Sequence, residues 1–199
     1  VNEILKPTIE ILAGIPSVVL GFLGILVLSP FMRETFNLPT GLTAFTGAFL
    51  LALISIPTIV SIAEDALYAV PNTYRDAAYA LGASKWQVIW QVVLPAAKSG
   101  ILTAVMLGVG RSLGETMAVM MVTGNAPTVF SGLNSFIAPV RTMTATIASE
   151  MGEVATGSLH YRILFFIGII LFIFSLIINI SSSKSLSKVS AKNRAKMVS

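Results

Sequence analysis

Two charged residues, Arg111 and Glu115, stand inside the otherwise apolar run 100–122. An arginine at the centre of a bilayer costs at least about 2.5 kcal/mol, so it must face a polar cavity or a partner charge. In a continuous helix Glu115 lies one turn beyond Arg111, and Ser112 and Thr116 add hydroxyls nearby. A guanidinium presents a planar fork of donors that matches the oxygens of an oxyanion. The pair therefore predicts either a structural ion pair or a transient anion site.

A second group of residues, at 71–98, predicts two short helices separated by a glycine. Thr73 and Asp76 have the spacing of a capping box, which satisfies the free amides at a helix start, and Gly82 favours the left-handed conformation that closes a helix. Ser84 opens the second helix with the same signature, and Pro95 is expected to end it. One face of this second helix carries an apolar stripe: Trp86, Ile89, Trp90 and Val93.

The stripe has two interpretations that periodicity alone leaves open. It can insert into a groove of another protein, as amphipathic helices do, or it can pack on the helices of its own chain. The pair of helices also resembles a helix-turn-helix DNA reader. Duplex binding normally relies on several phosphate contacts, whereas the second helix offers only Lys85 before Lys98. We therefore expect no nucleic-acid partner.

These segments must be positioned by helices that cross a membrane. Hydrophobic residues make up 55% of the 199 residues and charged residues only 11%, against roughly a quarter charged in soluble domains. A span needs about 20 apolar residues, and the uncharged runs predict four of them. The predicted transmembrane bundle, 1–183, is all-α, with spans at about 11–32, 42–66, 100–123 and 163–183. The kinks expected in this bundle are at Pro16 and Pro57.

The distribution of Lys and Arg predicts the orientation of the bundle. With a cytoplasmic N-terminus, nine of these cations lie on the inside and three on the outside. The positive-inside rule then places the loop 71–98 and the C-terminus in the cytoplasm, in a multi-pass protein of the plasma membrane. The basic tail 184–199 is too polar to bury a core, and we expect it to be solvated. The remaining alternative is a patch that binds membrane lipid.

The loop 71–98 resembles the EAA loop of ABC importer permeases. Asp76-Ala77-Ala78, then Gly82 after three residues, and Val92-Val93-Leu94-Pro95 after nine more match E-A-A-x3-G-x9-I-x-L-P, with Asp for Glu and Val for Ile. The resemblance implies docking into a cleft of an ATP-hydrolysing subunit. The residues expected to carry this coupling are Asp76, Ala77, Ala78, Gly82, Ser84 and Trp86.

The third apolar run resembles the phosphate permeases of the PstC type. Residues 110–119 read GRSLGETMAV where that family has GRALGETMAV, and further matches are GIPSVV at 14–19 and PVRTMTA at 139–145. The resemblance implies a MetI-like ABC importer permease fold and phosphate passage along Arg111, Ser112, Glu115 and Thr116. The family carries two more helices upstream, so we expect the first helices to be missing.

The same resemblance implies several partners. They are a dimer of ATP-binding subunits, a PstA-like permease subunit and an extracytoplasmic phosphate-binding protein. The permease itself is expected to hydrolyse nothing and to need no cofactor. The alternatives are a related ABC importer for another solute, such as sulfate or molybdate, and an intramembrane enzyme. The enzyme would need a catalytic serine with histidine, paired aspartates or a histidine pair at membrane depth, and the sequence has none of these.

The segment 124–161 is long for a simple connection, and such loops are usually functional. Its apolar periodicity predicts helical segments on the outer face, with Arg141, Glu150 and Glu153 at the rim. They form a landing surface for a binding protein or simply pack over the bundle. His160 has no second histidine or cysteine to share a metal, so we expect it to face solvent and predict no metal site.

Overall fold

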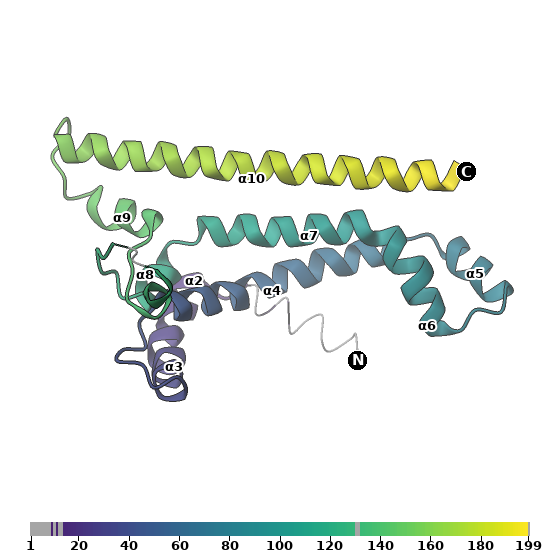
Figure 1. Cartoon of the computed structure of the whole chain (residues 1–199), viewed down its shortest axis with the longest axis horizontal. Helices are drawn as coiled ribbons and strands as arrows, with labels where there is room; N and C mark the ends of the chain where they lie inside the picture. Colours follow the sequence, from purple (N-terminus) through teal and green to yellow (C-terminus); the bar gives the residue numbers. More distant parts are fainter. Residues whose placement is uncertain (1–8, 10, 12–13, 130–131, 199) are drawn as a thin grey trace.

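The computed structural model describes residues 9, 11, 14–129 and 132–198, and the regular structure within them is helical apart from one isolated bridge, Gly124 to Val140. Four helical stretches are long and apolar enough to cross a membrane: Ser17–Thr35, Ala44–Tyr68, Lys85–Gly114 and Leu159–Ile180. Figure 1 shows the long helices α4, α7 and α10 running along one axis, with α5 and α6 at one end and α3 and α9 at the other. The expected all-α bundle is therefore confirmed.

The first span consists of α2 (Ser17–Leu23), a π-helical turn (Gly24–Leu28) and α3 (Ser29–Thr35). The predicted kink at Pro16 is wrong, because Pro16 is the residue just before α2 and starts the helix. Proline suits that position, since its missing N–H has no partner to lose there. Pro57, in contrast, lies buried inside α4 (Ala44–Tyr68).

Small residues bring α4 and α7 (Leu94–Gly114) together in an antiparallel pair. A Cβ added at Gly100 would lie 2.4 Å from Cβ of Ala66, and one added at Gly108 would lie 2.3 Å from Cγ1 of Ile59. Glycine at these positions lets two membrane helices approach closely, which gains dispersion contacts that lipid cannot replace. This contact fixes the register of α7 along α4.

The third span is not the single helix that we predicted over 100–123. It begins earlier, because the chain is helical from Lys85, and α7 ends at Gly114. Glu115 has extended backbone angles, and a separate helix, α8 (Met117–Val122), follows. Glycine at 114 lowers the helical preference, and the Glu115 carboxylate accepts a hydrogen bond from Ala118 N–H, which supports a new helix start.

The short helix α8 continues the path of α7 along the N-terminal half of α4. Ala118 and Val122 form a buried cluster with Leu50 and Ile54. A Cβ added at Gly24 would lie 2.6 Å from Val122, so the first span packs closely on the same helix. The range 100–123 therefore crosses alongside α4 as two helices with a break between them.

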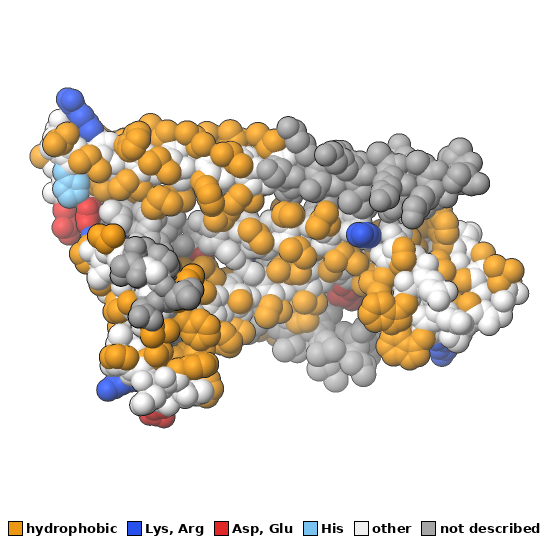
Figure 2. Space-filling view, viewed as in Figure 1, with side chains coloured by type: hydrophobic (Ala, Val, Ile, Leu, Met, Phe, Trp, Pro, Cys, Tyr) orange, Lys and Arg blue, Asp and Glu red, His pale blue; other side chains and the backbone are white. Residues whose placement is uncertain are grey.

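The last helix, α10 (Leu159–Val198), includes the fourth span and continues through the basic tail. We expected a solvated tail beyond residue 183. Residues 169–198 contain neither glycine nor proline, so an existing helix can propagate through them without paying for a new nucleus. Within the span, Phe166 and Phe172 are among many exposed apolar side chains. Figure 2 shows that the visible face between the two ends of the bundle is mostly apolar.

The close contact of α4 and α7 leads to a first prediction. We expect Gly108→Val to lower the free energy of unfolding by about 1–3 kcal/mol, because the added side chain must displace Ile59 or separate the helices. Gly110→Val is the matched control, since a Cβ there meets nothing within 4 Å. Unfolding of the purified protein in mixed detergent micelles measures the difference. Equal effects of the two substitutions would contradict the proposed packing.

Candidate functional site

The loop between the second and third spans forms a rigid projection, here called the docking elbow, that extends from Asn72 to Val93. Its first helix, α5 (Asn72–Ala80), follows Pro71 directly and has no side-chain cap. The predicted capping box at Thr73 and Asp76 is therefore wrong. Pro71 has an extended conformation that begins the helix one residue earlier, so Thr73 lies inside the first turn and is not the capping residue.

Gly82 ends α5 as predicted. Its φ is +81°, a left-handed conformation that glycine adopts without steric cost. Gly82 N–H donates to the carbonyl of Tyr79 at 2.9 Å, and Ala83 N–H donates to the carbonyl of Ala78 at 3.1 Å. These two bonds make a Schellman motif, which satisfies the last carbonyls of the helix. The corner between the two helices is thus fixed by backbone hydrogen bonds.

The second predicted capping box is confirmed. Ser84 Oγ accepts from Gln87 N–H, and Gln87 Oε1 accepts from Ser84 N–H at 2.8 Å, at the start of α6 (Lys85–Gln87). The predicted end at Pro95 is wrong, because a π-helical segment (Val88–Val93) joins α6 to α7 and Pro95 lies in the first turn of α7. Proline is tolerated in a first turn, where few intrahelical bonds are lost.

The π-helical segment also changes which side chains are exposed. Because hydrogen bonds in a π-helix join residues five apart, Val93 turns to the same side as Val88, and both are buried with Val70 and Ala97. Val93 thus packs on its own chain, the second of the two interpretations that the sequence left open for the stripe. The other three stripe residues are exposed, with Trp86 at 69%, Trp90 at 63% and Ile89 at 43%.

The residues predicted to couple to an ATPase lie on the free surface of the docking elbow, except one. Asp76, Ala77, Gly82, Ser84 and Trp86 are exposed, and Ala78 is half-buried against the Val70 cluster. A side chain anchors the elbow to the membrane helices, since Arg75 Nη2 donates to the carbonyl of Leu67 at 2.9 Å. The elbow is therefore both exposed and firmly joined to α4.

A polar cluster joins α4 to α7 near the middle of α4. Arg111 lies in the last turn of α7, and its Nη1 donates to Oγ1 of Thr58 at 2.7 Å. One turn away on α4, the hydroxyl of Ser55 shares a 2.6 Å hydrogen bond with the hydroxyl of Ser112. Arg111, Thr58, Ser55 and Ser112 form what we call the mid-span cluster.

The structure separates the predicted pair of Arg111 and Glu115. Among the described residues no ion pair joins them. The reason is the helix break, which removes the one-turn spacing that we expected and directs Glu115 to Ala118 N–H at 3.3 Å. Thr116 Oγ1 donates to the carbonyl of Gly114 at 3.2 Å. Thus Arg111 and Ser112 contact α4, while Glu115 and Thr116 satisfy backbone groups at the break.

Sequence reasoning missed Ser55 and Thr58. Both are hydroxyl residues in an otherwise apolar span, three positions apart and therefore close on one helical face. Hydroxyls that bond between helices are enriched at membrane helix interfaces. The spacing of these two hydroxyls was the available signal in the sequence. Their partners, Ser112 and Arg111, follow only from the register of α4 against α7.

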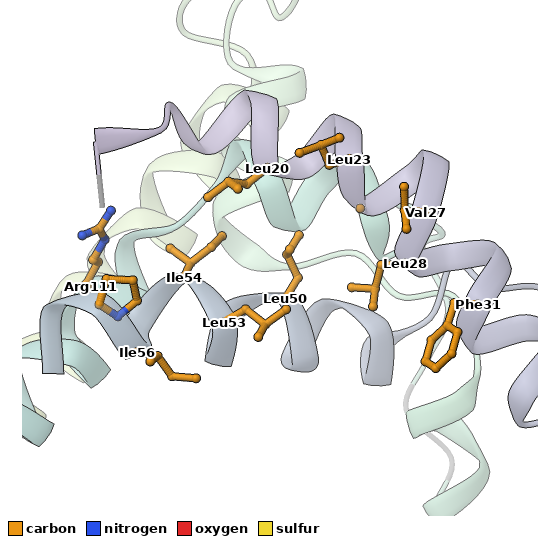
Figure 3. Close-up of a pocket in the computed structure, with 12 residues that line it drawn as sticks. Leu20, Leu23, Val27, Leu28, Phe31, Leu50, Leu53, Ile54, Ile56 and Arg111 are labelled. Atoms are coloured by element: carbon orange, nitrogen blue, oxygen red, sulfur yellow. The ribbon is translucent and has the colours of Figure 1, made fainter. Parts of the chain in front are cut away.

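The Arg111 guanidinium also forms one end of an apolar cavity of about 460 Å³. Figure 3 shows the cavity between the first span and α4, with Arg111 at one end of a row of aliphatic side chains. The lining residues include Leu20, Leu23, Leu50, Leu53 and Ile54. The Arg111 side chain is exposed, so its remaining N–H donors are accessible at this end of the cavity. The arrangement suits transient oxyanion binding.

The outer loop has the expected helical character, with a 3-10 turn (Leu133–Ile137) and α9 (Met143–Glu150). Glu150 links two side chains, forming an ion pair with Arg141 and a 2.8 Å contact with His160 Nε2. The His160 side chain is 53% exposed, which agrees with its predicted position, and Glu153 is exposed as well. In the described part of the chain, no group of three or more acidic, histidine or cysteine residues is arranged for a metal ion.

Comparison with known proteins decides the family. Residues 1–187 match the family described as binding-protein-dependent transport system inner membrane component. The chain belongs to this family. Together with the four apolar helical stretches, this membership makes it a multi-pass membrane protein.

Several relatives of this transport component have been named. It is 40% identical to the "Probable ABC transporter permease protein YqgH" of Bacillus subtilis, over 92% of this chain and 60% of the relative. It is 36% identical to the "Phosphate transport system permease protein PstC" of Mesorhizobium japonicum, over 94% of this chain and 62% of the relative. The chain therefore spans about three fifths of the length of these relatives.

Solved structures confirm the fold of this transport component. A chain of the structure titled "Inward facing conformations of the MetNI methionine ABC transporter" superposes with a TM-score of 0.68 and 19% identity, covering 94% of this chain and 77% of that chain. A second crystal form of the same transporter gives a TM-score of 0.65. The expected MetI-like fold is thus confirmed.

The mid-span cluster leads to a second prediction. A double-mutant cycle of Ser55→Ala and Ser112→Ala is expected to give a coupling free energy of about 0.6 kcal/mol and at most about 1.7 kcal/mol, the average and the maximum for hydrogen bonds between membrane helices. Unfolding in mixed micelles measures each variant. The control pair is Ser55→Ala with Thr103→Ala, because the Thr103 hydroxyl bonds within its own helix to the carbonyl of Ser99. Additive effects in the first cycle would contradict the Ser55–Ser112 bond.

Proposed function

We propose that this chain is the transmembrane channel subunit of an ATP-driven importer for inorganic phosphate. The family membership supports a permease of a binding-protein-dependent importer. Relatives named as phosphate transport permeases support the substrate, including those of Mesorhizobium japonicum and Haemophilus influenzae at 36% and 34% identity. The permease does not hydrolyse ATP itself, and a partner subunit does so.

The observation that carries the proposal is the position of the Arg111 guanidinium. It bonds to Thr58 near the middle of α4, and Arg111 itself lines one end of an apolar cavity. An arginine at this depth of a span costs several kcal/mol unless water or a polar group meets it. The Arg111 side chain is exposed and bonds to Thr58, and a guanidinium binds phosphate oxygens through parallel hydrogen bonds. In our proposal Arg111 binds phosphate transiently near the middle of the membrane, and Ser112, Glu115 and Thr116 lie along the same path.

The docking elbow provides the coupling in this proposal. With the C-terminus and the elbow in the cytoplasm, as the distribution of Lys and Arg favours, Asp76, Ala77, Gly82 and Trp86 face a dimer of ATP-binding subunits. Ala78 packs α5 against the buried cluster of Val70, Val88, Val93 and Ala97, and Ser84 caps the start of α6 on the same surface. Closure of the ATPase dimer would then move α4 and α7 together and open the path alternately to each face.

Two further partners complete the proposed transporter. A PstA-like permease subunit supplies the other half of the path, because four spans do not enclose one alone. An extracytoplasmic phosphate-binding protein delivers the substrate to the outer loop, where Arg141, Glu150 and Glu153 form a charged rim. The alternative cargo is another oxyanion, such as sulfate or molybdate, which the same guanidinium can bind.

The anion role of Arg111 leads to a third prediction. Arg111→Ala is expected to abolish phosphate uptake in cells, while the assembled transporter is still recovered, because the loss is of an anion contact and not of the fold. Arg162→Ala is the control, since Arg162 is exposed at the start of α10. Radiolabelled phosphate uptake, normalised to copurified complex, measures the effect. Normal phosphate uptake by Arg111→Ala would remove the anion role. Uptake of sulfate instead of phosphate by the wild-type transporter would favour the alternative cargo.

The coupling role of the elbow leads to a fourth prediction. Gly82→Asp is expected to weaken copurification of the ATP-binding subunits and to lower uptake, because a charged side chain is added where the elbow meets its partner. Gly157→Asp, in the segment 124–161, is the matched control, because Gly157 has a φ of +84° and a Cβ there also meets nothing within 4 Å. Both variants are compared by affinity copurification from membranes. Wild-type recovery of the ATPase with Gly82→Asp would show that the elbow docks elsewhere.

A further inference from the structure

Thr58 is the residue of the mid-span cluster that contacts the Arg111 guanidinium. It lies within the apolar span α4, and its Oγ1 accepts the 2.7 Å hydrogen bond from Arg111 Nη1. A serine or threonine inside a helix can donate its hydroxyl to a carbonyl of the preceding turn, as Ser55 and Thr103 do here. Thr58 donates to no carbonyl among the described residues. The Thr58 O–H is therefore not used on the backbone of its own helix.

The contact leaves donors on both residues. A guanidinium has five N–H donors, and a hydroxyl has one donor and two acceptor lone pairs. Arg111 uses one N–H on Thr58 and makes no other hydrogen bond to the part of the chain that is described. Thr58 accepts that bond and keeps its own O–H. Side by side, the two groups present several donors to the same space.

The rest of the mid-span cluster fixes this arrangement. The Ser55–Ser112 hydrogen bond of 2.6 Å and the close approach of Gly108 to Ile59 hold α4 and α7 in register on both sides of Thr58. An anion site depends on donors that are already in place, because little free energy is then spent on ordering them. Thr58 is therefore held where it can orient the guanidinium.

We infer that Thr58 is a second residue of the anion site. Its oxygen positions the Arg111 guanidinium, and its O–H donates to an oxygen of the phosphate that Arg111 binds. This inference rests on the proposed role of Arg111 in anion passage. It adds a specific consequence, because the site then needs a hydroxyl on α4 as well as a cation on α7.

The test compares variants of Thr58 in the complete transporter. Thr58→Val removes the hydroxyl at nearly constant volume, Thr58→Ala removes it without adding a methyl group, and Thr58→Ser keeps it. Thr103→Val is the matched control on α7, because its hydroxyl bonds only within its own helix. Phosphate binding to the purified complex without its binding protein is measured from the thermal shift caused by inorganic phosphate, and uptake is measured per assembled transporter.

We expect Thr58→Val and Thr58→Ala to weaken phosphate binding at least about tenfold, the effect of losing a hydrogen bond to a charged group. Thr58→Ser is expected to restore most of the affinity, and Thr103→Val to resemble wild type. Phosphate binding by Thr58→Val equal to that of Thr103→Val would overturn the inference. Failure of both Thr58→Val and Thr58→Ala to assemble would also overturn it, because the hydroxyl would then serve folding.

Arg111→Ala separates this inference from the proposed function. If Arg111→Ala loses phosphate binding while the two Thr58 variants retain it, the inference about Thr58 fails and the anion role of Arg111 stands. If Arg111→Ala binds phosphate as wild type does, both fail together. Loss of binding in Arg111→Ala and in both Thr58 variants, with rescue by Thr58→Ser, supports both.

Discussion

The antiparallel contact of α4 with α7 and α8 is the constraint on which the other features depend. Between membrane helices the hydrophobic effect contributes little, so close packing and a few hydrogen bonds must hold them together. Gly100, Gly108 and Gly47 each leave no room for a side chain against the opposite helix. The atoms that an added Cβ would meet belong to Ala66 at Gly100, to Ile59 at Gly108, and to Thr123, just after α8, at Gly47. The register is therefore fixed, and with it the height of Arg111.

The same contact explains how a helix can break inside the bundle. Backbone groups at such a break must be satisfied internally, because lipid offers no hydrogen bonds. Glu115 accepts from Ala118 N–H, and Thr116 donates to the carbonyl of Gly114. Non-helical backbone at membrane depth is tolerated where protein or a cavity surrounds it, and broken helices in transporters commonly line the substrate path. The break at 115–116 fits that pattern.

Much of the fold could be predicted because charge and chain length constrain a membrane protein strongly. The uncharged runs predicted four spans, and Gly82 and Ser84 predicted the helix end and the capping box of the elbow. The errors have physical causes that no local pattern contains. Pro71 began α5 before Thr73, and the π-helical segment rotated Val93 away from Trp86 and Trp90. A helical wheel assumes a constant period, so one wide turn changes the face of every later residue.

The site was harder to predict than the fold, because its residues meet across helices. Arg111 and Glu115 were conspicuous as charges in an apolar run, but their spacing suggested a pair that the helix break prevents. Thr58 was inconspicuous, since a lone hydroxyl costs little in a membrane helix and can bond to its own backbone. Only the register set by Gly100 and Gly108 brings Thr58 to Arg111.

The separation of Arg111 from Glu115 has a consequence for the electrostatics of the path. A fixed ion pair would satisfy the guanidinium permanently, and an anion would have to displace the carboxylate before it could bind. A neutral hydroxyl orients the guanidinium without cancelling its charge, so the attraction for an oxyanion remains while the geometry is held. A site of this kind binds weakly and releases readily, which is what passage requires.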